Sequence, residues 1–185
     1  DASSIKYKLF LLQKSDILTT VVVLNYNAGK LLIDCVQSLI NTNYHKLEII
    51  VVDNISTDNS QKICKEKFPE IKLIENKENL GYCEGNNVGI RNAKGKFIVI
   101  LNPDTKVEPN WLEELFNAYE KLGDGLYQPK IMSFEDNLFE SGGNMLQIFG
   151  FGYSKGRGIT DEGQFDESGE IGYASGACLF TKTEI

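Results

Sequence analysis

A short apolar run that ends in an asparagine and an aspartate is the feature of this chain best suited to chemistry. Residues 99–101 (Val-Ile-Leu) are followed at once by Asn102, Pro103 and Asp104. Amide and carboxylate oxygens bind hard divalent cations, and Mg²⁺ needs only one or two protein ligands when phosphates supply the others. The run therefore predicts a buried strand that presents a metal ligand to a diphosphate-bearing substrate, with the proline fixing the turn.

Polar side chains also follow the other predicted strands. Asn25-Tyr26-Asn27 follows the first apolar run, Asp53-Asn54 follows the second, and Asn79-Leu80-Gly81 comes after the third. Open α/β sheets bind their ligands at the carboxyl ends of their strands. Four polar strand ends on one chain predict a single site for a nucleotide diphosphate.

The elements that must position these residues are read from the alternation of apolar and amphipathic segments. From residue 17 to residue 134 this alternation is typical of βαβ units, so we predict an α/β fold with a mostly parallel sheet. Strands are predicted at residues 18–24, 47–52, 71–75, 97–101 and 177–181, and helices at 32–40, 57–68, 86–93 and 108–122. Ser56, Thr57 and Asp58 are candidate caps for the second helix.

Composition excludes several classes of protein. The chain has 185 residues, with 19 basic and 26 acidic side chains and a net charge of −7, so nucleic acid is not expected as a partner. Four scattered cysteines without a C-x-x-C pair predict neither a zinc site nor a disulfide framework, and reduced thiols point to the cytoplasm. The lone His45 lies in a polar connection, so histidine-based hydrolysis is disfavoured.

Four motifs, taken in their order, resemble family 2 glycosyltransferases of the GT-A fold. They are N-Y-N at residues 25–27, V-V-D-N-x-S-T-D at 51–58, N-L-G-x-x-x-G-N-N-x-G-I at 79–90 and L-N-P-D-T at 101–105. The likeness extends over residues 19–180 and is greatest to the rhamnosyltransferase-like branch. It implies a Rossmann-like, three-layer α/β/α fold that transfers a sugar from a nucleotide donor with inversion.

The resemblance assigns the nucleotide to the first two strand ends. Asp53 is expected to accept the imide N–H of uracil or thymine, which favours UDP or dTDP as the donor nucleotide. Tyr26, between Asn25 and Asn27, is expected to stack on the base or ribose. The alternatives are that Asp53 only caps the next helix and that Tyr26 only packs against the neighbouring turn.

The resemblance also assigns the diphosphate and its cation. Asn79, Gly81, Asn86 and Asn87 are expected to flank the nucleotide, although either Asn86 or Asn87 can instead brace the helix. Asn102 and Asp104 stand at the positions of the family's D-x-D motif, so they are the expected ligands of Mg²⁺ or Mn²⁺. Asn102 replaces the first aspartate of that motif and removes one charge. The alternative for Asp104 is that it is only an N-cap or a turn residue after Pro103.

The C-terminal part is expected to begin the acceptor side. Gly176 and Ala177 resemble the family's G-A motif beside the acceptor, while the general base of similar enzymes comes later and is expected beyond Ile185. We therefore predict an N-terminal extension or expression remnant at residues 1–16, a donor-binding region at 17–134, and the start of an acceptor-binding region at 135–185.

Two other functions remain open at this stage. A non-catalytic nucleotide- or glycan-binding module is favoured by Asn102 and by the expected absence of the base. A sugar-phosphate nucleotidyltransferase needs a glycine-rich, arginine-containing loop after the first strand, where residues 25–30 read Asn-Tyr-Asn-Ala-Gly-Lys. For a glycosyltransferase we expect a glycan or lipid-linked acceptor. The apolar residues 9–12 are compatible with three alternative roles: an added strand, peripheral association with the inner face of the membrane, or a signal-peptide remnant.

Overall fold

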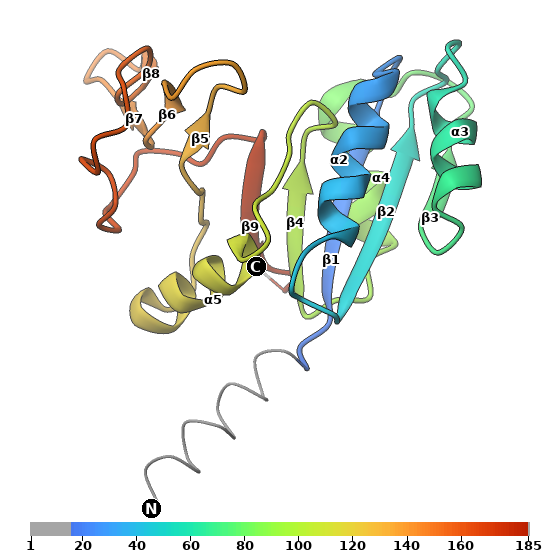
Figure 1. Cartoon of the computed structure of the whole chain (residues 1–185), viewed down its shortest axis with the longest axis horizontal. Coiled ribbons are helices and arrows are strands. Elements are labelled where there is room, and N and C mark those ends of the chain that lie inside the picture. The colour runs from blue at the N-terminus through green and yellow to red at the C-terminus, as the bar shows by residue number, and fades with distance from the viewer. Residues whose placement is uncertain (1–15, 185) are drawn as a thin grey trace, which may run out of the picture.

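A five-stranded mixed sheet forms the centre of the molecule (Figure 1). The computed structural model describes residues 16–184, so the predicted extension at residues 1–16 lies almost entirely outside the described part. The strands are β1 (Thr19–Asn25), β2 (Leu47–Asp53), β3 (Lys72–Glu75), β4 (Phe97–Leu101) and β9 (Cys178–Lys182). Their order is β3-β2-β1-β4-β9, and only the β4–β9 pairing is antiparallel. The prediction of a mostly parallel sheet is confirmed.

Helices cover both faces of this sheet. They are α2 (Lys30–Ile40), α3 (Ser60–Lys67), α4 (Gly81–Arg91) and α5 (Trp111–Leu122). Apolar residues of α2, α3 and α5 pack in one core cluster with Val21 and Val23, whereas α4 packs against Val22 on the opposite face. All of β1 is buried, as expected for a parallel strand covered on both sides. The predicted three-layer α/β/α arrangement is confirmed.

The chain changes direction across the sheet between β1 and β4. The chain adds β2 and then β3 next to β1, towards one edge of the sheet. The connection through α4 then places β4 on the other side of β1. The segments after β1 and β4 consequently separate from each other at the carboxyl edge of the sheet. Such a switch point is where open α/β folds form a ligand crevice.

Helix α4 approaches the sheet closely because two of its three glycines lie against strand β1. A Cβ atom on Gly89 would lie 2.3 Å from Cγ1 of Val22, and one on Gly85 would lie 2.5 Å from Cδ1 of Leu24. Both positions therefore exclude larger side chains unless the helix moves. This close packing fixes the start of α4 relative to the end of β1.

Strand β9 is held against the sheet by aromatic rings. Phe97 of β4 and Phe180 of β9 stack with ring centroids 5.2 Å apart, and the edge of Phe116 from α5 meets both rings. A late strand at residues 177–181 was predicted, and it forms one residue further along. Its position fixes the preceding segment, residues 175–177, beside the end of β4.

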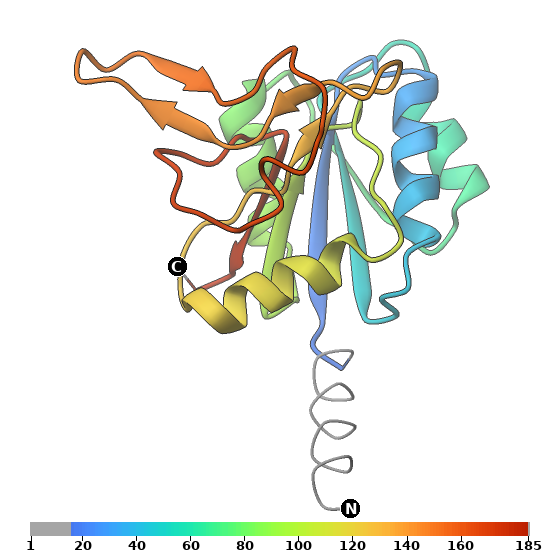
Figure 2. The same ribbon diagram turned by 60° about the vertical axis from the view of Figure 1, so that its left-hand side comes forward.

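Residues 126–176 form a smaller region beside the main sheet (Figure 2). Two short antiparallel pairs occur there: β5 (Ile131–Met132) with β6 (Phe139–Ser141), and β7 (Asn144–Leu146) with β8 (Gly152–Ser154). Buried Asn144 accepts hydrogen bonds from Ser141 and Ser154 and donates one to Gln128. Gln128 also accepts from the backbone N–H of Ser175, which connects this region to the segment before β9.

Three predicted helix starts differ from the structure by three residues or more. Helix α4 begins at Gly81 rather than at residue 86, because the tight packing of Gly85 and Gly89 extends the helix into the glycine-rich motif. Helix α3 begins at Ser60 rather than 57, since the chain reaches it through a left-handed residue, Asn59, and the cap is limited to Asp58 accepting from the Ser60 N–H. Helix α5 begins at Trp111 rather than at residue 108.

Candidate nucleotide and cation site

A pocket of about 440 Å³ opens at the switch point between β1 and β4. Five of the predicted site residues line it, namely Tyr26, Asn79, Gly81, Asn102 and Asp104. The other lining residues are Leu24, Ala28, Leu31, Asn54, Tyr82 and Pro103. Three separate strand ends and the start of a helix thus contribute to one cavity.

Asn102 and Asp104 form the wall of the pocket that follows β4. The backbone N–H of Asn102 donates to the carbonyl of Ala177 at 3.0 Å, and the Asn102 carbonyl accepts from the N–H of Thr105 at 3.2 Å. These two bonds hold the turn in one conformation, with Asp104 exposed at its outer side. One carboxylate and one amide are therefore presented to the same space.

Asp53 lies beneath the surface of this edge of the sheet. It is 1% exposed, and its Oδ1 accepts from Asn25 Nδ2 at 2.7 Å while Oδ2 accepts from the Ser56 N–H at 2.9 Å. It does not line the pocket, whereas the next residue, Asn54, does. The contacts also do not support the alternative that Asp53 caps the next helix. Asp53 accepts from the N–H of Ser56 in the preceding turn, and it is Asp58 that accepts from the N–H of Ser60 at the start of α3.

Asn25 and Asn27 stabilise the loops around the pocket rather than lining it. Nδ2 of fully buried Asn25 lies 2.7 to 3.0 Å from acceptor oxygens of Asp53, Ser56 and Ser60, which share its two N–H groups. Asn27 takes a left-handed conformation with φ of 54° and accepts from the Thr57 N–H at 2.7 Å. Between these two residues, Tyr26 is 54% exposed and lines the cavity.

The start of α4 forms the opposite wall. Oδ1 of Asn79 accepts from the N–H of Gly81 at 2.9 Å, and Gly81 has a φ of +71°, which favours glycine. The positive end of the helix dipole therefore lies at the pocket. Asn86 is buried and donates to the Tyr82 carbonyl, while exposed Asn87 donates to Glu84, so both amides contact the helix itself.

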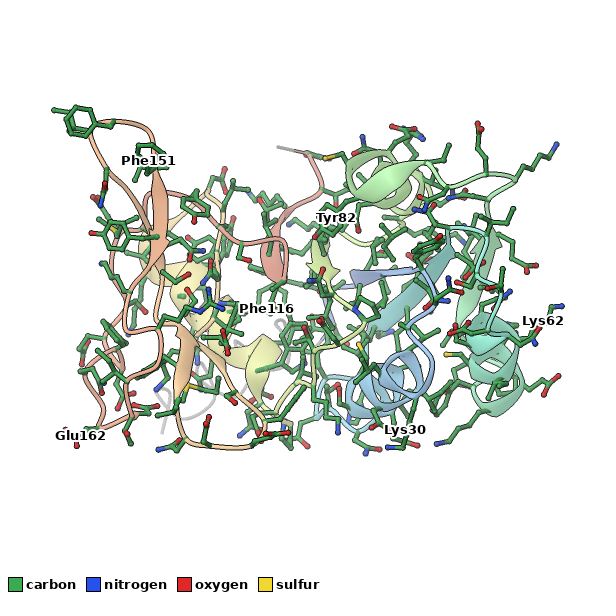
Figure 3. All side chains as sticks on the ribbon, turned by 90° about the horizontal axis from the view of Figure 1, so that it is seen from above. Lys30, Lys62, Tyr82, Phe116, Phe151 and Glu162 are labelled. Atoms are coloured by element: carbon green, nitrogen blue, oxygen red, sulfur yellow. The ribbon has the colours of Figure 1, made fainter. Side chains whose placement is uncertain are left out.

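Tyr82 is a pocket residue that the sequence interpretation did not single out. Its hydroxyl donates to the Gly176 carbonyl at 2.8 Å and lies 3.3 Å from the Asn102 side-chain amide. Figure 3 shows Tyr82 on the side of α4 that faces the chain entering β9. Partial burial raises the pKa of Tyr82, so the hydroxyl keeps its proton. Its position directly after Gly81, inside the motif at residues 79–90, is the sequence signal that could have indicated it.

Gly176 and Ala177 lie next to the pocket without lining it. A Cβ atom on Gly176 would lie 2.2 Å from the Tyr82 hydroxyl oxygen, so glycine is required for the observed contact. Ala177 meets the other wall through its carbonyl, which accepts from Asn102. Ala177 is thus hydrogen-bonded directly to the predicted cation ligand Asn102, whereas Gly176 is connected to it through the Tyr82 hydroxyl.

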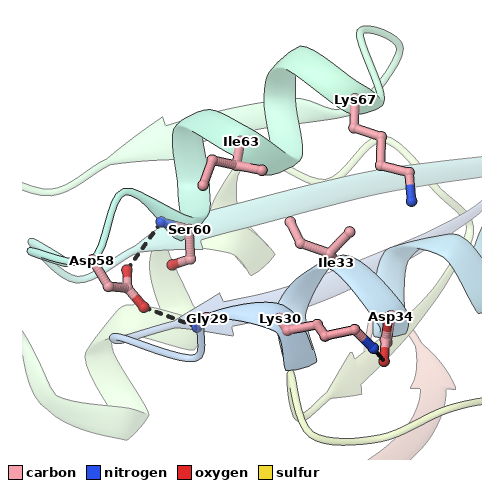
Figure 4. Close-up of a pocket in the computed structure, with 8 residues that line it drawn as sticks. All are labelled: Gly29, Lys30, Ile33, Asp34, Asp58, Ser60, Ile63 and Lys67. Atoms are coloured by element: carbon pink, nitrogen blue, oxygen red, sulfur yellow. Dashed lines mark hydrogen bonds and ion pairs between the residues drawn. The ribbon is translucent and has the colours of Figure 1, made fainter.

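A second depression, of about 370 Å³, lies between α2 and α3 (Figure 4). Ile33 and Ile63 supply its apolar part, and Lys30 at its edge forms an ion pair with Asp34 at 2.8 Å. None of the predicted site residues lines it. The pocket at the strand ends is therefore the candidate site.

The donor set at residues 102–104 suits a cation that is shared with phosphates. Within residues 16–184 there is no group of three or more histidine, cysteine, aspartate or glutamate side chains able to hold a metal ion alone. Mg²⁺ and Mn²⁺ accept a small number of protein oxygens when phosphate oxygens and water complete the shell. One carboxylate and one amide oxygen fit that requirement.

Comparison with known proteins identifies the class to which this fold and site belong. The mannosyltransferase PcManGT from Pyrobaculum calidifontis, in complex with GDP-Man and Mn²⁺, superposes with a TM-score of 0.57 and 25% identity over 63% of this chain and 36% of its own. Staphylococcus aureus TarS in complex with UDP-GlcNAc also gives 0.57, with 21% identity over 68% of this chain and 39% of its own. The fold is GT-A.

The sequence comparisons identify the family. The family model described as Glycosyl transferase family 2 matches residues 20–185, and the chain therefore belongs to that family. Glycosyltransferase GlyG of Streptococcus pneumoniae is 36% identical over 107 residues, which are 56% of this chain and 36% of that protein. The minor teichoic acid biosynthesis protein GgaB of Bacillus subtilis is 30% identical over 55% of this chain and 12% of its own.

The chain thus spans about a third or less of these curated relatives. The rhamnosyltransferase-like branch stays a prediction. Among the described residues, no helix is both long and apolar enough to span a lipid bilayer.

Proposed function

We propose that the pocket binds the nucleotide diphosphate of a sugar donor, and that the sugar is transferred to a glycan or lipid-linked acceptor with inversion. The observation that carries this proposal is the meeting of Tyr26, Asn102, Asp104 and the start of α4 in one cavity at the switch point. A flat base, two phosphates and a cation need an aromatic face, a positive helix end and oxygen ligands, respectively. The pocket offers one of each.

The diphosphate is proposed to lie between the helix start and the 102–104 turn. The N-terminal end of α4 favours negative charge, and Asp104 with Asn102 would hold Mg²⁺ or Mn²⁺ on the opposite wall. When bound, such a cation supplies charge stabilisation for the departing nucleotide diphosphate. A single carboxylate then suffices in the cation site, because the N-terminal end of α4 supplies much of the positive charge that compensates the diphosphate.

The base is proposed to stack on Tyr26, with UDP or dTDP as the nucleotide. The contacts of Asp53 favour a supporting role over direct capture of the imide, because both of its oxygens already accept hydrogen bonds and it is 1% exposed. Through Asn25 and Ser56 it fixes the two ends of the turn that carries Tyr26. Base recognition then depends on the shape of this turn.

The acceptor is proposed to approach past residues 175–177. Gly176 contacts Tyr82 and Ala177 contacts Asn102, so this segment lies directly beside the wall of the proposed donor pocket. An inverting displacement also needs a general base for the attacking hydroxyl. We assign that role to none of residues 16–184.

A nucleotide screen by thermal unfolding tests the donor proposal. UDP, dTDP, GDP and ADP are each added with MnCl₂ or with EDTA. Ligand at about 100 times its dissociation constant adds about 2.7 kcal/mol of stability. We expect UDP or dTDP to raise the melting temperature most, and to do so more in Mn²⁺ than in EDTA. Equal shifts for all four nucleotides would contradict base selectivity, and no shift with any of them would contradict the proposed function.

A further inference from the structure

The hydroxyl of Tyr82 faces two hydrogen-bond acceptors although it carries one proton. Its oxygen lies 2.8 Å from the Gly176 carbonyl oxygen and 3.3 Å from Oδ1 of Asn102. The proton goes to Gly176, which is the nearer acceptor. The lone pairs of the same hydroxyl then face Asn102 and can accept from a donor there.

The Gly176 carbonyl is fixed on both sides, so this use of the proton is enforced by the fold. Before it, the N–H of Ser175 donates to Gln128 at 2.7 Å, and after it the Ala177 carbonyl accepts from the Asn102 N–H at 3.0 Å. The stacked rings of Phe97 and Phe180 hold the strand that follows. The carbonyl therefore cannot turn away from Tyr82 without disturbing the sheet.

An asparagine side chain resolves such a conflict by exchanging its two ends. Rotation by half a turn about the last side-chain bond places Nδ2 where Oδ1 was, with almost no change in shape. Nδ2 then donates to the Tyr82 hydroxyl, and Oδ1 turns away from Tyr82. Tyr82, Asn102 and Asp104 line the same pocket, so the freed oxygen is available to a cation there.

We propose that Tyr82 is a positioning residue that orients the Asn102 amide, so that the amide presents its oxygen rather than its NH₂ group to a cation bound beside Asp104. This inference rests on the proposed function, since it concerns the same cation. It explains how an amide can stand where the family's D-x-D motif has a carboxylate. A carboxylate offers oxygen in either orientation and needs no partner to turn it, whereas an amide does.

A double-mutant cycle tests this role through binding, without reference to turnover. The variants are Tyr82→Phe, Asn102→Asp and the double mutant, and calorimetry measures their affinity for UDP, or for the nucleotide that the screen selects, in MnCl₂ and in EDTA. Tyr82→Phe keeps the ring and removes only the hydroxyl. We expect it to weaken binding in Mn²⁺ by about fivefold, the scale of one hydrogen bond, and to leave binding in EDTA unchanged.

The Asn102→Asp background distinguishes orientation from general support. There, Tyr82→Phe is expected to change the affinity in Mn²⁺ by less than about twofold, because the introduced carboxylate presents an oxygen in either orientation. An equal loss in both backgrounds, or an equal loss in EDTA, overturns the positioning role while the proposed function stands. If the unchanged protein binds no nucleotide, or binds it equally in Mn²⁺ and EDTA, the cation site itself is overturned.

Discussion

Two buried asparagines organise the two regions of this molecule, and they do so with different partners. Asn25, at the end of β1, is fully buried and donates to a carboxylate, Asp53, inside the main three-layer region. Asn144, at the start of β7, is 2% exposed and bonds to the neutral groups of Ser141, Ser154 and Gln128. One asparagine compensates a buried charge, and the other joins short strands.

The surroundings of the two asparagines differ as much as their partners. Around Asn25 the neighbouring strands are covered on both faces. In the smaller region, by contrast, the turn between β7 and β8 exposes Ile148 by 94% and Phe149 by 82%. The main region therefore owes its shape to apolar layers that fix a charged network between them. The smaller region is joined by a polar hub that involves no charge, and the following predictions test this difference.

Removing each hub should show the largest difference. Asn25→Ala leaves the buried Asp53 carboxylate with one fewer donor, so we expect it to lower the free energy of unfolding by about 3 kcal/mol. Asn144→Ala leaves only neutral groups unpaired and should lower it by about 1 to 2 kcal/mol. Urea unfolding, followed by circular dichroism and by tryptophan fluorescence, measures both changes.

The Asp53→Asn background provides the control. There the cost of Asn25→Ala should shrink, because the partner of Asn25 no longer carries a charge, while the cost of Asn144→Ala should stay the same. If Asn25→Ala costs no more than Asn144→Ala at neutral pH, the charged network is not what distinguishes the two regions.

A pair of glycines gives a second and smaller contrast. Gly89→Ala places a Cβ atom 2.3 Å from Val22 Cγ1, so overpacking should outweigh the gain in helix propensity and destabilise the protein by about 1 to 2 kcal/mol. Gly169→Ala in the smaller region meets nothing within 4 Å and should change stability by less than about 0.5 kcal/mol. Equal effects in the same unfolding assay would show that α4 is not tightly constrained by β1.

The same contrast explains how much could be predicted from the sequence. Strand β4 was predicted with both of its bounds correct, because an apolar run that ends at Asn-Pro-Asp is a strong local signal. The start of α4 was missed by five residues, since glycines argue against helix locally and only the packing of Gly85 and Gly89 on the sheet reverses that preference.

The candidate site was predictable where strand ends supply it and not where distant segments meet. Tyr26, Asn102 and Asp104 follow strands directly, and the pocket contains all three. The hydroxyl of Tyr82 meets Gly176, 94 residues away in the sequence, and no local pattern indicates that contact. The burial of Asp53 is likewise a consequence of how Asn25 and Ser56 close over it.

The affinity for a nucleotide diphosphate in Mn²⁺, compared between the unchanged protein and Asp104→Asn, tests the central claim most directly. Asp104→Asn keeps the shape of the side chain and removes the only carboxylate that lines the pocket within residues 16–184. Glu108→Gln, an exposed change nearby in the chain, is the matched control. We predict that Asp104→Asn weakens UDP binding in Mn²⁺ by about tenfold or more and leaves binding in EDTA unchanged, whereas Glu108→Gln changes neither. Equal affinity of the unchanged protein and Asp104→Asn in Mn²⁺ would contradict the account.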